Sequence, residues 1–295
     1  MITIIGATGT IGRLTLSALL DQGVRVAAVT RDPHSELPAG AYRIVGDPGR
    51  PETLAGAIDG TQALLISPRA VGPALADLLE LARRGGTRQA VLLSAATVAY
   101  PAGLAKFRAG FEAAELATAE SGLEWTFLRS TDYAANALAW AGQVRAGDVV
   151  RGAYAAARTS TVHERDVAAV AARALTEPGH AGKSYILTGP ESLSQADKVR
   201  LLGAATGRPL TFQELPPDDV RAGMLAAGLP EEVPDRLLGS LADYAREPGP
   251  TSDDVEKVLG RPALTFADWA AEHAAAFTGG AAFASGAAFT SGGAR

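Results

Sequence analysis

A glycine-rich turn directly after the first apolar run constrains this chain more than any other feature of its sequence. Residues 2–5 read Ile-Thr-Ile-Ile, and Gly6-Ala7-Thr8-Gly9-Thr10-Ile11-Gly12 leads into the helical pattern of residues 13–22. Glycines at this spacing between a strand and a helix serve a tight turn, a close approach of ligand to backbone, and close packing of helix on strand. The helix N-terminus adds unpaired N–H groups and a partial positive charge. The motif therefore predicts a dinucleotide-phosphate site at Gly6, Thr8, Gly9, Thr10, Ile11 and Gly12.

Short β-branched runs alternate with longer helical segments along most of the chain. We expect strands at about 2–6, 24–29, 42–46, 63–67, 89–94, 124–129 and 184–188, and helices at about 11–22, 51–58, 72–84, 104–121 and 164–176. Runs that are apolar throughout, such as Val91-Leu92-Leu93, are typical of strands buried on both faces of a parallel sheet. Gly23 and Gly122 stand where helix C-termini need a left-handed residue. The pattern predicts an α/β fold with a Rossmann-type, doubly wound parallel sheet.

The second half of the chain indicates a smaller subdomain beside the sheet. Ser194 and Asp197 have the spacing of an N-cap and its acidic N3 partner, which opens a helix to about Thr206. From about 207 onward the pattern is helical, with prolines as breaks. We expect an NADP-binding Rossmann domain at 1–150 and a smaller, mostly helical C-terminal subdomain at 151–277, on the substrate side and interleaved with the sheet.

Residues 278–295 form a low-complexity tail of Ala, Gly, Ser and Phe. The unit Ala-Ala-Phe-Thr-Gly-Gly at 275–280 recurs with changes at 281–286 and 287–292. A period of six residues is not helical, and the Gly and Ser content favours a flexible or extended segment. Two interpretations stay open: a disordered tail, or phenylalanines that dock on an apolar groove of the same or a neighbouring subunit.

The end of the second strand decides between cofactors. An acidic residue there would bind a ribose 2′-hydroxyl and select NAD, whereas an arginine accommodates the 2′-phosphate of NADP. The sequence reads Val29-Thr30-Arg31-Asp32-Pro33, so Arg31 ends the strand, and a guanidinium suits a phosphate. We expect NADP(H) as cofactor, with Arg31 at the 2′-phosphate. The alternative is that Arg31 is merely solvated and Asp32 reads the ribose.

Polar residues at three later strand ends complete the expected cofactor site. Asp47 follows the third strand, where a carboxylate accepts from an adenine amino group or simply caps the helix near Pro51. Ser67 and Pro68 follow the fourth strand and Ser94 ends the fifth. Ligands in such sheets lie at the carboxyl ends of the strands, so Ser67 and Pro68 are predicted to edge the nicotinamide ribose, and Ser94 to face the nicotinamide.

The net charge and the numbers of cysteines and histidines argue against several classes of function. The 27 basic and 32 acidic residues give a net charge of −5, which argues against a nucleic-acid partner. Without cysteines the chain has no disulfides or thiolate sites, and its four histidines are scattered without metal-ligand spacing. Neither a signal segment nor a membrane-spanning stretch is evident, since the uncharged run 274–294 lacks Leu, Ile and Val. We expect a cytoplasmic protein.

Several segments together resemble one known family. The resemblance is carried by the GATGTIG turn, the VTRDP segment, Glu115, the run Ser-Gly-Leu-Glu-Trp-Thr-Phe-Leu-Arg at 121–129, Asn136, the segment 163–168 and Leu-Thr-Gly-Pro-Glu at 187–191. Together these segments are similar to the NmrA-like branch of atypical short-chain dehydrogenases/reductases. The likeness runs over roughly residues 1–277. It implies an NADPH-dependent quinone or azo reductase, an isoflavone-type reductase, or an NADP-sensing regulator without catalysis. It also implies a substrate pocket between the Rossmann half and the C-terminal part.

The usual proton-donating pair of this superfamily is missing. Many relatives use a tyrosine and a lysine four residues later, in which the ammonium lowers the pKa of the phenol. Here Leu104 follows Tyr100 at that offset, and Ala102 precedes Lys106. Some members carry a lone lysine on the helix after the fifth strand, so Lys106 is a displaced candidate for catalysis, with a solvated lysine as the alternative. A missing pair favours quinone-like or conjugated acceptors over plain ketones.

Two loops should face the nicotinamide, after the fifth and sixth strands. They carry Ser94, Thr97 and Tyr100, and then Thr131, Asp132, Tyr133 and Asn136. We predict substrate contacts at Tyr100, Tyr133, Asn136 and Trp140, and a catalytic role for Tyr133. Structural roles are the alternative for Tyr133, Asn136 and Trp140. His163, which precedes a helix, is expected to be structural rather than a proton donor.

Three functions fit these patterns. The first is an NADPH-dependent oxidoreductase that transfers a hydride to a small aromatic or conjugated, quinone-like substrate. The second is an NADP(H)-binding redox sensor that acts through a protein partner. The third is an isomerase, epimerase or cyclase on the same fold, because substrate loops rather than folds set function. We expect a small-molecule partner, no metal, no nucleic acid, no membrane, and a monomer or homodimer.

Overall fold

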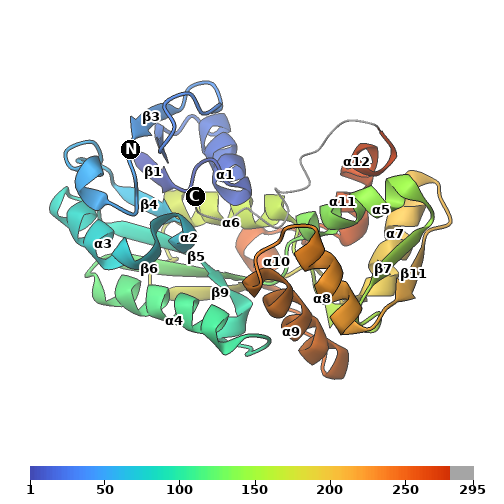
Figure 1. The fold of residues 1–295 in the computed structure, drawn as a ribbon. Helices are drawn as coiled ribbons and strands as arrows, with labels where there is room; N and C mark the ends of the chain where they lie inside the picture. The colour runs from blue at the N-terminus through green and yellow to red at the C-terminus, as the bar shows by residue number, and fades with distance from the viewer. Residues whose placement is uncertain (280–295) are drawn as a thin grey trace.

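A seven-stranded parallel sheet forms the centre of the computed structural model, which describes residues 1–279 (Figure 1). Its strands are β1 Ile2–Ile5, β2 Val26–Thr30, β3 Tyr42–Val45, β4 Ala63–Ile66, β5 Gln89–Ala95, β6 Glu124–Ser130 and β9 Lys183–Leu187. They lie in the order β3-β2-β1-β4-β5-β6-β9. The chain therefore builds outward from β1 in one direction, crosses back, and continues from β4 in the other. Such a reversal beside β1 is where doubly wound sheets bind ligands.

Each inner strand is apolar because both of its faces are covered. Ile4 pairs in register with Ala28 of β2 and Leu65 of β4, and all three are fully buried in the core on one face. Their neighbours in sequence, such as Ile5 and Leu64, point to the other face and its separate core. Period-two side-chain alternation makes a sheet with two buried faces read as a continuous apolar run.

Helices cover both faces of the sheet, and others lie beyond the carboxyl ends of its strands. They are α1 Thr10–Asp21, α2 Pro68–Val71, α3 Leu75–Arg84, α4 Ala105–Glu120, α5 Ala141–Ala146, α6 Glu164–Thr176, α7 Gln195–Thr206, α8 Pro217–Ala226, α9 Glu232–Arg246, α10 Asp254–Leu259, α11 Phe266–Glu272 and α12 Ala274–Thr278. On one face α1 and α6 pack together through residues such as Leu16, Leu19 and Val170. On the other, α3 and α4 pack through Leu78, Leu79 and Ala114. The doubly wound fold predicted from the sequence is confirmed.

A third core lies beside the sheet, around the fully buried Trp269. It gathers α5, α7, α11 and α12 with a parallel pair of short strands, β7 Val149–Gly152 and β11 Thr211–Glu214. A second small pair joins β8 Arg158–Thr159 to β10 Leu193–Ser194. Because this core includes Ala137 and Val144, it draws on chain from both sides of residue 150. The division into 1–150 and 151–277 stays a prediction.

Some predictions of helix ends and short elements are confirmed, and others are wrong. The Ser194–Asp197 capping box at the start of α7 is confirmed, as are positive φ angles at Gly23 and Gly122. The expected helix 51–58 is wrong: the structure has a single 3₁₀ turn, η1 Pro51–Leu54. The expected helix from 72 starts instead with the 3₁₀ turn η2 Gly72–Ala74, and α3 begins at Leu75. The short pairs β7–β11 and β8–β10 were not predicted, since strands of two to four residues give little periodic signal.

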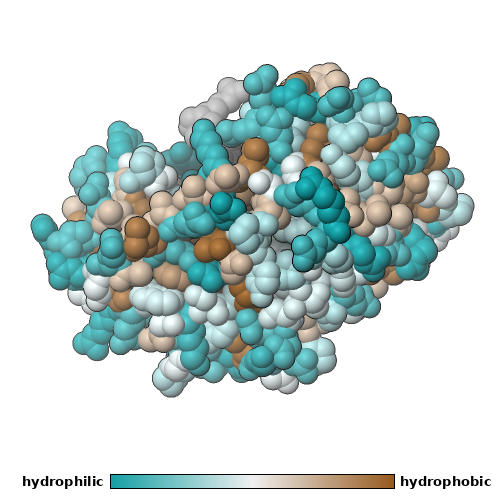
Figure 2. Space-filling model, turned by 90° about the horizontal axis from the view of Figure 1, so that it is seen from below, coloured by the Kyte–Doolittle hydropathy of each residue, from teal (hydrophilic) through white to brown (hydrophobic). Residues whose placement is uncertain are grey.

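Among residues 1–279 the exposed large apolar side chains are Tyr42, Val45, Tyr100, Leu104 and Leu116. On the face seen in Figure 2 hydrophobic residues form small separate groups among hydrophilic ones. None of the helices within residues 1–279 combines the length and apolar character that crossing a bilayer demands. The first phenylalanine of the tail repeat, Phe277, is fully buried in the third core. The predicted tail conformation at 280–295 lies outside the described residues.

Candidate active site

A cavity of about 400 Å³ opens at the carboxyl ends of the central strands. Its lining comes from the glycine turn after β1, the start of α2 after β4, the end of β5 with the 3₁₀ turn η3 Ala96–Val98, and the 3₁₀ segment η4 Ala134–Trp140 after β6. Residues of α6, α7 and α9 close the far side. Of the predicted site residues, this cavity is lined by Gly6, Gly9, Thr10, Ile11, Gly12, Ser67, Pro68, Ser94, Tyr133, Asn136 and Trp140. It is not lined by Thr8, Arg31, Asp47, Tyr100 or Lys106.

The glycine turn is shaped by its own packing at two of its three glycines. Gly6 has φ +92°, and a Cβ there would lie 2.8 Å from the Cβ of Ser67. A Cβ at Gly12 would overlap the carbonyl oxygen of Gly6. Both positions therefore exclude larger residues for reasons internal to the protein.

Gly9 is different, because nothing in the protein crowds it. A Cβ there would meet the carbonyl oxygen of Gly6 at 3.4 Å, which is ordinary contact, and its φ is −76°. Gly9 lines the cavity and caps α1 without any side-chain hydrogen bond. Within residues 1–279 the backbone N–H groups of Thr10, Ile11 and Gly12 have no hydrogen-bond partner. Free donors at a helix N-terminus beside a bare glycine fit a pyrophosphate.

Directly after β2, the carboxylate of Asp32 has a hydrogen-bond partner, whereas Arg31 has none in the described residues. Asp32 accepts from the backbone N–H of His34 at 2.8 Å, and Arg43 donates to the carbonyl oxygen of Ser35 at 2.7 Å. Arg31 is exposed and, in the part of the chain that the structure describes, makes no hydrogen bond or ion pair. This arrangement is consistent with Arg31, rather than Asp32, as the residue that receives a ligand.

Asp47 has local partners in its own loop. Its carboxylate accepts from the backbone N–H of Gly49 at 3.0 Å and pairs with Arg50 at 3.3 Å. These contacts stay within the loop and do not cap η1, whose N-cap is Arg50 and has no side-chain hydrogen bond. The capping alternative is therefore not confirmed, and the adenine contact stays a prediction.

Ser94 lines the cavity, and its hydroxyl has a partner in the protein. The hydroxyl donates to Oε1 of Glu115 at 2.6 Å, and Arg129 donates to both carboxylate oxygens of Glu115 at 2.9 and 2.6 Å. The hydrogen bond to Glu115 raises the pKa of Arg129. The triad joins β5, α4 and β6 beneath the cavity, which gives the Glu115 and Arg129 of the recognised motif a structural role.

Three predicted substrate residues come together on the segment after β6. Tyr133 is half-buried at the cavity wall, and burial raises the pKa of its phenol. Asn136 is exposed at the cavity, and Trp140 packs edge-on against Phe212 with ring centroids 6.5 Å apart. Tyr100, by contrast, is half exposed and away from the cavity, so the structure does not bring it to the site.

Lys106 lines a neighbouring cavity of about 550 Å³ rather than this one. The two cavities share Pro68, Arg69, Phe107, Phe111 and Arg236 as lining residues. The predicted catalytic role for Lys106 therefore finds no support in the geometry of the first cavity.

A buried lysine on α7 went unnoticed in the sequence. Lys198 donates to Asp132 at 3.1 Å and to the hydroxyl of Thr159 at 2.6 Å, and all three residues line the cavity. The other carboxylate oxygen of Asp132 and the hydroxyl of Thr97 are buried without a partner in the described residues. Because Lys198 and Asp132 are 66 residues apart, no local spacing could have paired them.

Glu164 is the second residue that sequence reasoning missed. It is 4% exposed, lines the cavity, and accepts from the backbone N–H of Ala135 at 2.5 Å. Burial, with a smaller contribution from Asp132, raises its pKa to about 7. Its neighbour His163 is the N-cap of α6, accepts from the N–H of Arg165 and does not line the cavity, as the structural interpretation of that histidine predicts.

Comparison with known proteins places the chain in a family. Residues 6–178 match the NAD(P)H-binding family. The chain is 35% identical over 281 residues to a (4-alkanoyl-5-oxo-2,5-dihydrofuran-3-yl)methyl phosphate reductase of Streptomyces griseus, covering 94% of this chain and 99% of the relative. It is 34% identical over 287 residues to an NAD(P)H azoreductase of Xenophilus azovorans, with the same coverage.

A solved structure agrees with the sequence relatives. The NADPH-dependent quinone oxidoreductase of Escherichia coli, crystallised with NADPH, superposes with a TM-score of 0.82 at 27% identity and covers 92% of this chain and 99% of its own. The match spans both the sheet and the C-terminal helices. On these grounds, and with the glycine turn inside the matched region, the chain belongs to the NAD(P)H-binding family and is an NAD(P)H-dependent oxidoreductase.

Proposed function

We propose that this protein uses NADPH to reduce a small, conjugated, quinone-like organic substrate. The observation that carries the proposal is one cavity lined both by the glycine turn, with its unpaired helix N–H groups, and by aromatic side chains. The aromatic residues are Phe107, Phe111, Tyr133 and Trp140. The names of the relatives support it, since azo compounds, quinones and an acyl dihydrofuranone are all conjugated acceptors.

The residues present fit a dinucleotide. Thr10, Ile11 and Gly12 would donate backbone N–H groups to its pyrophosphate, and Gly9 would leave room for it. Arg31 would bind a 2′-phosphate, which favours NADPH over NADH. When bound, the dihydronicotinamide supplies a hydride.

The chain itself contributes positioning, exclusion of water and protons. The aromatic residues offer flat surfaces for a conjugated ring. Tyr133 holds its proton on the cavity wall at neutral pH, and Glu164, whose pKa burial raises to about 7, exchanges a proton there. The Lys198–Asp132 pair fixes the loop after β6 against α7. Quinone-like acceptors need little acid assistance, which is compatible with a site without the Tyr/Lys pair.

An absorbance assay of NADPH oxidation tests the proposal. Purified protein is mixed with NADPH and, separately, a naphthoquinone, an azo dye and a simple ketone. We expect oxidation well above background with the first two acceptors and none with the ketone. Tight NADPH binding without oxidation by any acceptor would contradict the reductase proposal and favour the redox sensor. A cytoplasmic location and a monomeric or homodimeric state stay predictions.

A further inference from the structure

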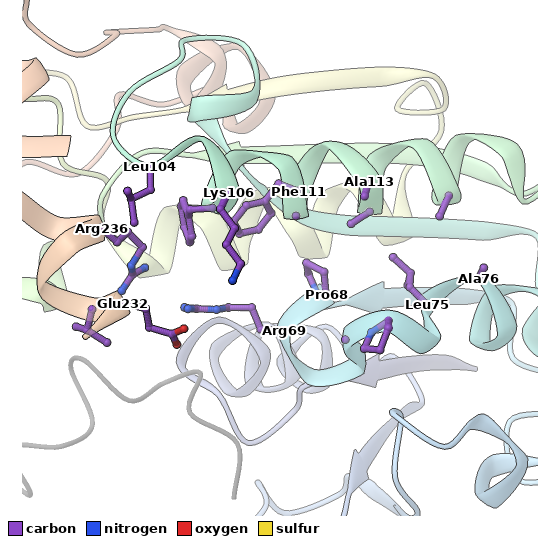
Figure 3. A pocket seen from close by; sticks show the side chains of 17 residues that line it. Pro68, Arg69, Leu75, Ala76, Leu104, Lys106, Phe111, Ala113, Glu232 and Arg236 are labelled. Atoms are coloured by element: carbon purple, nitrogen blue, oxygen red, sulfur yellow. The ribbon is translucent and has the colours of Figure 1, made fainter. Parts of the chain in front are cut away.

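The neighbouring cavity has a volume of about 550 Å³ and adjoins the one at the strand ends. It lies between α2–α3 on one side, α4 on the other, and the start of α9 at its end (Figure 3). Most of its wall is apolar: Leu75, Ala76, Phe111, Ala113, Ala114, Ala117 and Val233. Such a surface suits an alkyl chain or an unsubstituted ring.

One end of this cavity carries three cations from three separate elements. Arg69 comes from α2, Lys106 from α4 and Arg236 from α9, and Figure 3 shows their charged ends converging. Glu232 is the one acidic residue on the lining, so three positive charges and one negative leave a net of +2. Within residues 1–279 none of the three cations forms a hydrogen bond or an ion pair with a carboxylate.

The arginines are close enough to influence each other. Burial and the nearby charge of Arg69 lower the pKa of Arg236, whose guanidinium lies 4.9 Å from the ring centre of Phe107. Three cations beside a single carboxylate leave an excess of positive charge, which favours the binding of an anion. Guanidinium groups donate in a fork that matches phosphate and carboxylate oxygens.

The two cavities meet at this cationic end. Arg69, Phe107, Phe111 and Arg236 line both, so a molecule seated in the second cavity reaches the first past the two phenylalanines, whose ring centroids are 5.1 Å apart. A ligand that spans the two would place an apolar part against α3 and α4, an anion at the junction, and a reducible part beside the glycine turn.

We propose that the preferred substrates are anionic and apolar: a phosphate or carboxylate binds Arg69, Lys106 and Arg236, and an attached hydrocarbon group fills the cavity between α3 and α4. This inference rests on the proposed reductase function and adds the substrate class. It gives Lys106 a role in binding an anion.

Binding of three probes with the same chain tests the proposal without turnover. Decyl phosphate, decanoate and decanol are titrated by calorimetry into the NADPH-saturated protein. At least one anion is expected to bind about tenfold or more tightly than the alcohol. A phosphate that binds more tightly than the carboxylate identifies phosphate esters as the class, and the reverse order identifies carboxylic acids. Equal binding of all three probes would overturn the proposal.

Substitutions of the cations test whether these residues cause the preference for anions. Lys106→Gln and Arg236→Gln are each expected to weaken the anions by about five- to tenfold while the decanol affinity changes little. Arg108→Gln is the matched control, because Arg108 lies on the same helix, pairs with Glu112 at 3.1 Å and does not line the cavity. Retained NADPH binding shows that each variant is folded. An anion preference that survives in both Lys106→Gln and Arg236→Gln would also overturn the proposal.

Kinetics separate this inference from the function on which it rests. If a neutral naphthoquinone is reduced and a naphthoquinone with an alkyl carboxylate or alkyl phosphate chain has the same KM, the anion site is wrong and the reductase function stands. If the anionic probes bind as predicted and no acceptor is reduced, the reductase function is wrong, and the anion site survives as a binding site only.

Discussion

The glycine turn presents backbone to its ligand, whereas the two cavities beside it present side chains from many elements. The first surface comes from one short segment, residues 6–12, through Gly6, Gly9, Thr10, Ile11 and Gly12. The second draws on α2, α4, α6, α7, α9 and the segment after β6. Binding at the turn depends on the missing side chain of Gly9. Binding in the cavities depends on the charge and protonation of residues such as Lys106, Glu164 and Arg236. Binding at the turn is therefore sensitive to added volume, and binding in the cavities to charge.

The largest expected effect is on the turn. In Gly9→Ala the added methyl group meets only the carbonyl oxygen of Gly6 at 3.4 Å, so the protein should fold normally. The methyl group occupies the space in front of the free N–H groups, and the loss of about 3 kcal/mol of charge-assisted hydrogen bonding corresponds to a rise of about a hundredfold in the Kd for NADPH. Isothermal calorimetry and thermal unfolding measure the two quantities.

Substitutions at two other glycines serve as controls for Gly9→Ala. Gly142→Ala is the neutral control, because nothing lies within 4 Å of its added Cβ. Gly12→Ala should lower the unfolding temperature instead, because its Cβ overlaps the backbone of Gly6. If Gly9→Ala binds NADPH as the parent protein does, the turn is not the pyrophosphate site.

A smaller effect is expected from Glu164 on the substrate side. Burial raises its pKa from 4.5 to about 7, so the folded protein keeps a proton that the unfolded chain releases. The stabilisation is complete below pH 4.5 and is lost as the pH rises through about 7. Glu164→Gln keeps an acceptor for Ala135 and removes the titration. Between pH 4.5 and 7.5 it should gain between about 2 and 3 kcal/mol in free energy of unfolding relative to the parent.

Urea unfolding at a series of pH values checks this prediction. Parallel curves for Glu164→Gln and the parent would show that Glu164 ionises normally, and its role as a proton holder would be wrong.

The smallest of these effects concerns cofactor choice. Arg31→Ala should raise the Kd for NADPH by roughly tenfold, the worth of one charge-assisted contact at an exposed site, and leave the Kd for NADH nearly unchanged. Arg25→Ala is the control, since Arg25 is also exposed and lies at the opposite end of β2. An unchanged ratio of the two affinities in Arg31→Ala would leave the 2′-phosphate without a recognised partner.

The same contrast explains what the sequence could predict. The turn and the sheet are visible in the sequence because their signals are local: glycines at fixed spacing, and strands that are apolar throughout because both faces are buried. The η1 turn at Pro51 was mistaken for a helix, since a short apolar segment does not distinguish a single turn from several.

The cavities were predicted only in part, because their residues meet through packing. Tyr133, Asn136 and Trp140 were found since they follow a strand end, and strand ends share one edge of the sheet. Lys198 and Arg236 lie on helices far along the chain, where a lone charged residue looks like any solvated one. Lys106 was noticed, but its place in the second cavity depends on how α4 packs against α2 and α9.

Single-turnover oxidation of NADPH labelled with deuterium at nicotinamide carbon 4 tests the central claim most directly. The protein is mixed with the pro-R or the pro-S labelled cofactor and then with a neutral naphthoquinone. A cavity that holds the ring in one orientation predicts rapid oxidation and a primary isotope effect with one label alone. Labelled NADPH that binds and is never oxidised, or that reacts equally with either label, would contradict the account.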